Sequence, residues 1–312
     1  MHMPGVKNLL SFSRRLYRPE SLSDRQMSAA YLFILPALSI YIMFVLIPTL
    51  LTGWLSFFKW DGFAPERDWV GLVNYRNMLH DRVALLAFTH NMIWVLGAVA
   101  IPLLAGLLIA SFMASIKRGR LFFRVVFFLP MVFPPAVLAI IWQWIYSYRI
   151  GLLNTVLRAV GLESLAQSWL GQTETVLGAL IVAFSWSFYG FCVIILLGAL
   201  QNVPAALKEA ARIDGANAVQ VFLHVTLPSI RNELTFMITF TFITSMKSFV
   251  LPYIMTQGGP AYASEVIGTL LYRKSFVENS MGYGAALATV LTVIVVTVFL
   301  ISRIMQAKRE RA

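Results

Sequence analysis

Long apolar stretches separated by short polar segments run through most of the 312-residue chain. No Asp, Glu, Lys or Arg occurs at 26–58 or at 83–116, and further apolar stretches follow. A helix needs about 20 apolar residues to cross a bilayer, and both stretches are longer than that. The pattern therefore predicts an all-α polytopic membrane protein, whose helices pack on one another within lipid.

Six transmembrane helices are predicted, at 29–58, 88–111, 125–148, 176–200, 234–256 and 285–303. Pro36 and Pro48 lie in the first, where we expect bends or helix ends, which membrane bundles tolerate. The chain then divides into a basic arm (1–28), the first span (29–58), an outer loop with an interfacial helix (59–87), a core of five spans (88–304) and a basic tail (305–312). Within the core, a polar loop (201–230) joins the fourth span to the fifth.

The composition, 59% hydrophobic and 12% charged, excludes a pair of water-soluble domains. The net charge of +11 is distributed unevenly among the polar segments. The arm, the turn after the second span, the polar loop and the tail, counted with the adjacent Arg231 and Arg303, hold 16 of the 25 Lys and Arg, and the opposite loops hold 8. Because cytoplasmic loops are enriched in Lys and Arg, both termini and the polar loop are predicted to be cytoplasmic. The charge thus reflects topology, and nucleic acid is not expected as a partner.

The polar loop predicts two short helices joined by a turn. Pro204 suits a first helical position, and the eight residues after it are mostly strong helix formers. Gly215 stands where a helix needs a left-handed residue to stop, and a second helix is expected at 217–225. This helix should end before Leu227-Pro228, because proline disfavours helical backbone in the residue before it.

The same loop carries a spaced motif that resembles the EAA loop of the permease subunits of ATP-binding-cassette (ABC) importers. Its residues are Glu209-Ala210-Ala211, Gly215, Val225 and Leu227-Pro228, with Arg212 and Asp214 inside the spacing. The spacing fits throughout, and Val225 replaces the usual Ile. The resemblance implies a coupling helix that docks on a cytoplasmic ATPase. The alternative is an ordinary amphipathic connector with glycine as its helix stop.

Two further stretches, 68–79 and 142–154, resemble segments of carbohydrate-importing permeases. The resemblance covers the chain from about residue 29 onward and implies the first of two unlike permease subunits for a sugar or sugar-like solute. It implies three partners in a bacterial or archaeal cytoplasmic (inner) membrane: a second permease, an ATPase dimer and an extracytoplasmic solute-binding protein. ATP and Mg²⁺ would bind to the ATPase, and no cofactor is expected on this chain. An importer of a non-sugar solute is the alternative.

The sequence lacks the residues of several kinds of catalytic site. No G-x-x-x-x-G-K-[ST] sequence is present to bind nucleotide phosphates, and the four histidines are scattered. The acids all lie in loops, so no intramembrane carboxylate relay is predicted. The single cysteine, Cys192, excludes a disulfide and a thiolate metal site. We therefore predict no enzyme. A secondary carrier would need intramembrane acids or internal repeats, and a membrane enzyme would need clustered His, Asp or Glu.

One formal charge, Lys247, lies inside a predicted span, where a charge normally faces the bundle interior or a watery path. A regular helix would carry Thr244, Lys247 and Ser248 on one face, given their spacing. The segment resembles the fifth core helix of the family, which implies sugar contacts by Thr244 and Lys247. Many relatives carry Asn where this chain has Lys247. The alternative is that Lys247 snorkels or pairs within the bundle.

The fourth span offers a facing set of pathway residues. Trp186, Ser187 and Gly190 supply a stacking ring, a hydroxyl and a position of close approach, as a neutral sugar requires. Small and hydroxyl residues also form packing seams between membrane helices, which is the alternative. The aromatic residues at 142–148 are expected to form an interface belt, and His90 to lie near lipid headgroups.

Overall fold

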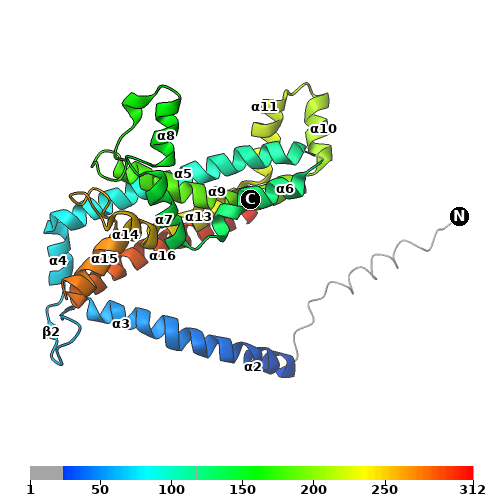
Figure 1. Ribbon diagram of the computed structural model, residues 1–312. Helices are drawn as coiled ribbons and strands as arrows, with labels where there is room; N and C mark the ends of the chain where they lie inside the picture. Colours follow the sequence, from blue (N-terminus) through cyan, green and yellow to red (C-terminus); the bar gives the residue numbers. More distant parts are fainter. Residues whose placement is uncertain (1–23, 117, 312) are drawn as a thin grey trace. The chain divides into compact units, whose positions relative to one another are not determined.

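The computed structural model describes residues 24–116 and 118–311, which are mostly helical (Figure 1). The described chain falls into two units, one ending at Leu51 and one beginning at Thr52, and each is described by itself. The predicted arm before residue 24 and Lys117 lie outside the described residues.

The N-terminal unit is a long helix. Helix α2 (Asp24–Tyr41) continues through a π-turn, η1 (Ile42–Leu46), into α3 (Ile47–Leu55), whose last residues belong to the second unit. Every side chain from Tyr31 to Leu51 is exposed, because no other described part of this chain covers it. A helix that is apolar on all sides is typical of a membrane span. The π-turn ends two residues before Pro48, and its wider hydrogen bonding fits the missing proline N–H.

Helices α5 (Arg82–Ser115) and α9 (Val176–Asn202) form the centre of the second unit and pack along each other. Their approach depends on glycine. A Cβ on Gly97 would lie 2.7 Å from Ile181, and one on Gly106 would lie 2.4 Å from Cys192. Small residues at such positions let backbones come close, which favours association of membrane helices.

Two predicted spans are broken, and this corrects the sequence analysis. The third consists of α6 (Arg120–Val132) and α7 (Pro135–Ile145), which meet at 96°. Phe133 and Pro134 between them have extended backbone, as residues before proline prefer. The fifth consists of α13 (Arg231–Met246) and α14 (Val250–Thr256), bent by 43°. Within the described residues, four helices are long and apolar enough to cross a membrane, or six if each bent pair counts as one span.

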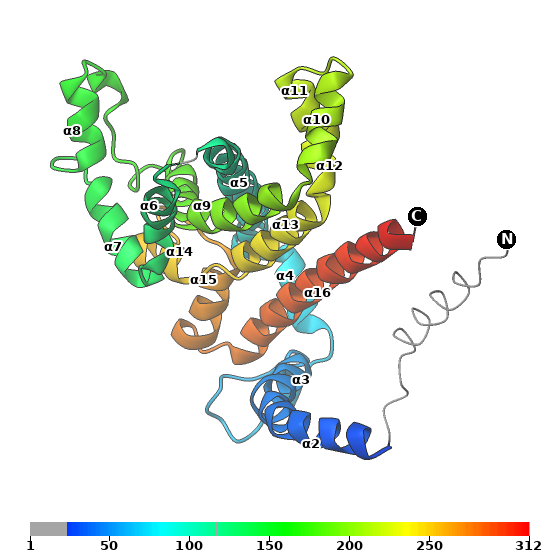
Figure 2. The ribbon, with the colours of Figure 1, turned by 90° about the vertical axis from the view of Figure 1, so that its right-hand side faces the viewer.

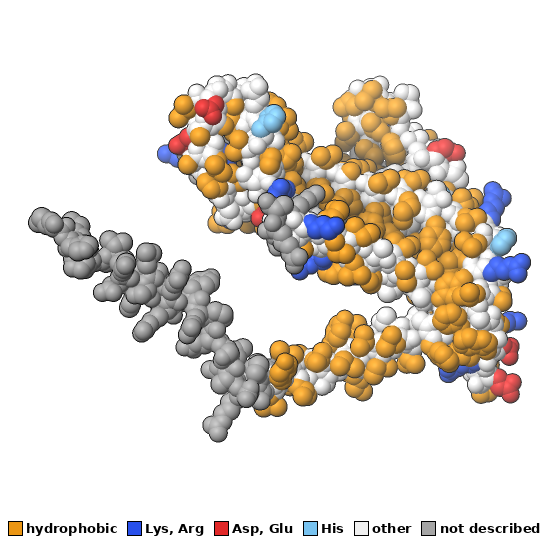
Figure 3. Space-filling model, turned by 180° about the vertical axis from the view of Figure 1, so that it is seen from behind, with side chains coloured by type: hydrophobic (Ala, Val, Ile, Leu, Met, Phe, Trp, Pro, Cys, Tyr) orange, Lys and Arg blue, Asp and Glu red, His pale blue; other side chains and the backbone are white. Residues whose placement is uncertain are grey.

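The last long helix, α16 (Met281–Arg311), begins earlier and ends later than the predicted sixth span. Short elements connect the long helices: α4 (Val73–His80), α8 (Leu152–Ala159), η2 (Glu163–Leu165), α15 (Ile267–Tyr272) and η4 (Arg273–Val277). Charged side chains gather toward the ends of the bundle, and hydrophobic ones cover its flank on the face shown in Figure 3. This distribution suits a bundle that lies within a bilayer.

A small antiparallel ribbon departs from the all-α prediction. Strands β1 (Phe58–Lys59) and β2 (Asp68–Trp69) pair, with Phe58 opposite Trp69 and their rings 5.0 Å apart. The Asn74 amide donates to the carbonyls of Ser56 and Phe58 at 2.8 and 2.9 Å, which ties α4 to the ribbon. Tertiary contacts therefore order this segment of the predicted outer loop.

Candidate functional site

A protruding segment between α9 and α13, residues 204–229, is called the hook here (Figure 2). Its first arm is α10 (Ala205–Ile213). Its second arm runs from α11 (Ala218–Val221) through a π-turn, η3 (Phe222–Thr226), into α12 (Leu227–Ser229). In both ribbon views the hook stands apart from α8, the other protruding arm of the second unit.

The turn of the hook is fixed by its own residues. Gly215 has a φ of +88°, and the N–H groups of Gly215 and Ala216 donate to the carbonyls of Arg212 and Ala211 at 3.1 and 2.9 Å. The Asn217 side chain accepts from the Gln220 N–H, and the Gln220 side chain accepts from the Asn217 N–H, at 3.0 and 2.8 Å. The glycine helix stop predicted from the sequence is present, followed by a capping box.

The second arm corrects one prediction. It does not end before Leu227-Pro228 but continues to Ser229. The reason is the π-turn, in which the Leu227 N–H donates to the carbonyl of Phe222, five residues back. The wider turn relieves the clash that a proline ring causes in a regular helix.

The predicted coupling residues lie on the outside of the hook or at its cleft. Glu209, Ala210, Arg212, Asp214, Gly215 and Pro228 are exposed, and Ala211 and Leu227 are half-buried. A cleft of about 340 Å³ lies between the arms, with Ala211, Asp214 and His224 in its lining. Leu207 and Ile213 expose 50% and 86% of their surface beside these charges.

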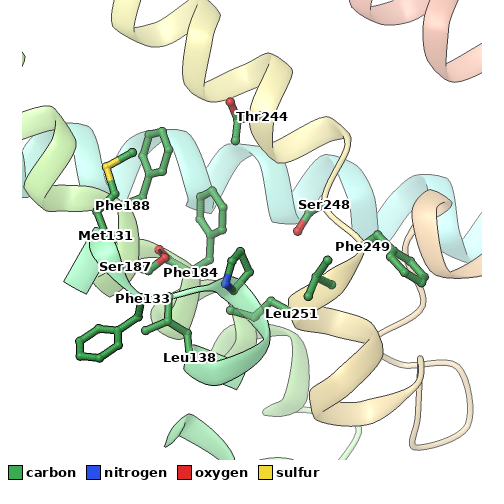
Figure 4. A pocket seen from close by; sticks show the side chains of 12 residues that line it. Met131, Phe133, Leu138, Phe184, Ser187, Phe188, Thr244, Ser248, Phe249 and Leu251 are labelled. Carbon is green, nitrogen blue, oxygen red and sulfur yellow. Dashed lines mark hydrogen bonds between the residues drawn. The ribbon is translucent and has the colours of Figure 1, made fainter. Parts of the chain in front are cut away.

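A second feature lies where the two broken helix pairs meet α9. They enclose a pocket of about 300 Å³, called the break pocket here (Figure 4). Its lining is apolar and aromatic except for three hydroxyl residues. The lining includes Met131, Phe133, Pro135 and Leu138 of the α6–α7 pair, Phe184, Ser187 and Phe188 of α9, and Thr244, Ser248 and Leu251 of the α13–α14 pair.

The three hydroxyls of the break pocket differ in their bonding. Ser187 donates to the Phe184 carbonyl at 2.7 Å, and Thr244 donates to the Phe240 carbonyl at 2.9 Å. Both oxygens keep lone pairs to accept a further hydrogen bond. Ser248 makes no side-chain hydrogen bond to any described residue. Ring faces with a few convergent hydroxyls are suited to a solute that has both apolar faces and hydroxyl groups.

The short halves of the two broken pairs are joined by Gln143, which the sequence analysis did not single out. Its amide on α7 donates to the carbonyls of Ile254 and Met255 on α14, at 2.9 and 3.2 Å. Burying an amide in an apolar segment is costly unless it is paired, so this contact stabilises the broken arrangement. A single Gln within the apolar stretch 132–145 was the available signal.

Lys247 corrects another prediction. It ends α13, because the helix stops at Met246, and so it does not share a helix face with Thr244 and Ser248. Its side chain lines a different pocket of about 310 Å³, called the lysine pocket here. The other lining residues are Met246, Phe249, Ile267, Gly268, Leu271, Tyr272 and Leu291. The two pockets lie beside the same break and share Phe249.

Of the residues predicted on the fourth span, Ser187 alone lines the break pocket. Trp186 is 37% exposed and makes an edge contact with Trp142 at 5.7 Å. A Cβ on Gly190 would lie 2.0 Å from the Phe127 carbonyl oxygen, so Gly190 forms part of the α6–α9 contact. The structure thus places Gly190 in a packing seam, which was the alternative reading of this residue type.

A buried acid, Glu265, was not predicted from the sequence. Glu265, in the loop between α14 and α15, is fully buried and forms an ion pair with Arg273. Burial raises the pKa of Glu265, and the Arg273 charge opposes that rise. The Nδ1 atom of His90, expected near headgroups, lies 3.2 Å from the Glu265 carbonyl. No group of three His, Cys, Asp or Glu that could hold a metal occurs in the described residues.

These features define a class of protein. Long apolar helices, two of them broken around a pocket, together with a polar hook outside the bundle, are typical of a membrane transport subunit. The family profile described as binding-protein-dependent transport system inner membrane component matches residues 102–311. The chain therefore belongs to this family of ABC transporter permeases.

Individual relatives extend the match over most of the chain. It is 37% identical over 266 residues to the probable ABC transporter permease protein YurN of Bacillus subtilis, covering 85% of this chain and 91% of the relative. It is 30% identical over 280 residues to the trehalose/maltose transport system permease protein MalF of Thermococcus litoralis, covering 90% and 94%. A chain in the crystal structure of a bacterial alginate ABC transporter, bound to its periplasmic protein, superposes with a TM-score of 0.78 at 18% identity, covering 91% and 96%.

Proposed function

We propose that this chain is the membrane-spanning subunit of an ATP-driven, binding-protein-dependent importer and forms half of the pathway for a sugar or sugar-like solute. The break pocket carries the proposal. It places the hydroxyls of Ser187, Thr244 and Ser248 among aromatic rings, between two broken helices. The name of the Thermococcus relative, which specifies trehalose/maltose transport, supports a sugar as the solute.

Each bent pair is taken as one span, which makes six spans with both termini and the hook in the cytoplasm. The distribution of Lys and Arg supports this topology. The membrane would be the cytoplasmic (inner) membrane of a bacterium or archaeon. The partners would be a second permease, an ATPase dimer that binds ATP and Mg²⁺, and an extracytoplasmic solute-binding protein. No covalent chemistry is assigned to this chain.

The hook would transmit ATPase motion to the pocket through α13. Glu209, Ala210, Arg212 and Asp214 on the first arm would contact the ATPase, together with Gly215 at the turn. The second arm ends at Ser229, and α13 begins at Arg231 with the buried Ile230 between them. The 16 residues of α13 then extend over about 24 Å toward the break pocket. Movement of the hook would thereby tilt one wall of the pocket.

Reconstitution tests this function. The chain is assembled with a second permease, an ATPase and a solute-binding protein from the same organism, and uptake of labelled mono- and disaccharides into proteoliposomes is measured with and without ATP. We expect sugar uptake that needs ATP and the binding protein. ATP-dependent uptake of a non-sugar solute alone would contradict the sugar assignment. Uptake driven by an ion gradient without ATP would contradict the importer assignment.

A further inference from the structure

The lysine pocket contains a cation without a counter-ion in the described part of the chain. Lys247 is exposed at the break between α13 and α14 and makes no hydrogen bond or ion pair to a described residue. It lies between two apolar helices that together are long enough to form a span. A charge in such a segment is costly unless an anion or water compensates it.

The acids near this pocket are already paired with other cations. Among the described residues, the neighbouring ion pairs are Arg273 with Glu265, and Lys274 with Asp81 at 3.6 Å and with Glu278 at 2.8 Å. Glu233 lies on α13 itself, but 14 residues before Lys247, which is about 21 Å along the helix. The surrounding fold therefore pairs Arg273 and Lys274 with acids but provides Lys247 with no counter-ion among the described residues.

The rest of the pocket lining is apolar and aromatic. The pocket has a volume of about 310 Å³, and Tyr272 lines it together with Lys247. The Tyr272 ring lies 5.3 Å from Phe249 and 4.9 Å from Tyr253, which forms an aromatic wall. Gly268 lets α15 approach the break, since a Cβ there would lie 2.6 Å from the Ser248 carbonyl oxygen. This close contact holds the wall next to the cation.

We propose that the lysine pocket recognises the anionic group of an acidic sugar, and that this importer therefore carries a sugar with a carboxylate or phosphate. The proposal rests on the function proposed above. The Lys247 ammonium would form a charge-assisted hydrogen bond with the anion, while the ring of Tyr272 or Phe249 contacts the sugar face. Because the ammonium is a compact charge with three donors, it suits either anion.

An anionic lipid headgroup offers the same chemistry, so the test excludes it. The assembled importer is placed in nanodiscs of phosphatidylcholine, which has no net charge, and its lysines are labelled by reductive methylation with ¹³C, which preserves their charge. The resonance missing in Lys247→Met identifies Lys247. Galacturonate and glucose 6-phosphate are titrated against the neutral controls galactose and glucose.

We expect the Lys247 resonance to shift saturably with an anionic sugar and to respond at least about tenfold more weakly to its neutral counterpart. Lys247→Arg should keep this preference, and Lys247→Met should abolish it. Lys59→Met, which removes an exposed cation of the β-ribbon, serves as the control and should change nothing. Equal responses to charged and neutral sugars, or none to either, would overturn the proposal.

Two further experiments complete the test. If nanodiscs with phosphatidylglycerol shift the Lys247 resonance without sugar and prevent the response to galacturonate, the anion is a lipid headgroup and the proposal fails. Sugar uptake is then measured for the wild-type importer and for Lys247→Met, so that failure of this inference can be told apart from failure of the proposed function. Unchanged uptake of both acidic and neutral sugars contradicts the anion site alone, whereas absence of all sugar uptake in the wild-type importer contradicts the importer function itself.

Discussion

The hook and the break pocket both interrupt helices, but the causes differ. At the hook the interruption is local, since Gly215 adopts a φ of +88° and Asn217 and Gln220 cap the next helix. At the break of α13 and α14 no glycine or proline lies among residues 247–249, although Pro252 follows on α14. Contacts from distant residues surround it, including Asn91, which donates to Met246 Sδ at 3.1 Å. The shape of the hook therefore depends on its own residues, whereas the shape of the pocket also depends on residues that are distant in the sequence.

Replacing the turn glycine should have the largest effect. Proline requires a φ near −65° and has no N–H, so Gly215→Pro cannot adopt the +88° backbone or donate to Arg212. We expect ATP-driven uptake to fall to background while the protein remains in the membrane. Uptake and co-purification with the ATPase are the two measurements.

Gly161→Pro is the matched control, because Gly161 also has a positive φ, of +79°, with open space around it and a donated N–H. It lies after α8, outside the hook. This variant should distort its own loop yet keep association with the ATPase. Equal loss of association in both variants would show that the hook has no special coupling role.

Tightening the packing at the break should have the next largest effect. A Cβ at Gly268 would lie 2.6 Å from the Ser248 carbonyl, so Gly268→Ala must push α15 away from the break. We expect a loss of about 1–3 kcal/mol in stability, the usual cost of overpacking. Gly198→Ala on α9 meets nothing within 4 Å and should be neutral or stabilising by up to about 1 kcal/mol. Thermal unfolding in detergent compares them, and equal melting temperatures would contradict a break held by packing.

Removing one hydroxyl from the break pocket should have a smaller effect. Thr244→Val loses one potential hydrogen bond to the solute, worth about 0.5–1.5 kcal/mol, so uptake should fall by about two- to tenfold. Thr235→Val is the control on the same helix. The Thr235 hydroxyl likewise donates to the carbonyl four residues back, at 2.8 Å, but lies outside the pocket. If both variants slow uptake equally, the pocket hydroxyl does not contact the solute.

The smallest effect is expected from removing the N-terminal cap of α5, which lies outside both the hook and the break pocket. Asp81 caps α5 by accepting from the Val83 N–H at 2.9 Å. Burial alone would raise the pKa of Asp81, but this bond, the Tyr283 hydroxyl and Lys274 together hold it below its usual value. Asp81→Ala should cost about 1 kcal/mol, as for other lost caps.

The pH dependence has a definite sign. A carboxylate with a lowered folded-state pKa stabilises the fold above its unfolded pKa of about 3.9, and this contribution disappears as the pH falls through the folded value. The difference in melting temperature between wild type and Asp81→Ala should therefore be constant near neutral pH and shrink below about pH 4. A difference that grows on acidification would contradict the assignment.

The two regions also explain what the sequence could reveal. The hook was predictable because its glycine stop, cap residues and spacing act within a few residues of one another. The break between α6 and α7 had a local signal in Pro134 and Pro135. The prediction of one continuous apolar span at 125–148 did not take these prolines into account. The break at Lys247 had a weaker local signal in Pro252, whose ring would clash with the Ser248 carbonyl in a regular helix. Its surroundings also include contacts from α5 and α15.

The positions of the candidate pathway residues were partly predictable for the same reason. Thr244, Ser248 and Ser187 were selected by residue type, and the fold does bring them to one pocket. The close contact of Gly190 with α6 and the position of Lys247 at the end of α13 were not predicted, because their surroundings depend on α6 and α15, which no local pattern positions. The buried Glu265 and the bridging Gln143 likewise acquire their roles from partners on distant elements.

Access to the break pocket from the two sides of the membrane tests the central claim most directly, namely that the hook and this pocket are coupled. Ser187→Cys is introduced with Cys192→Ser, and a membrane-impermeant thiol reagent is added to either side of the reconstituted importer, with and without ATP and the binding protein. The account predicts labelling from the cytoplasmic side without ATP and from the outer side with ATP, and loss of this change in Gly215→Pro. Labelling from the same side in both states, or an unchanged switch in Gly215→Pro, would contradict it.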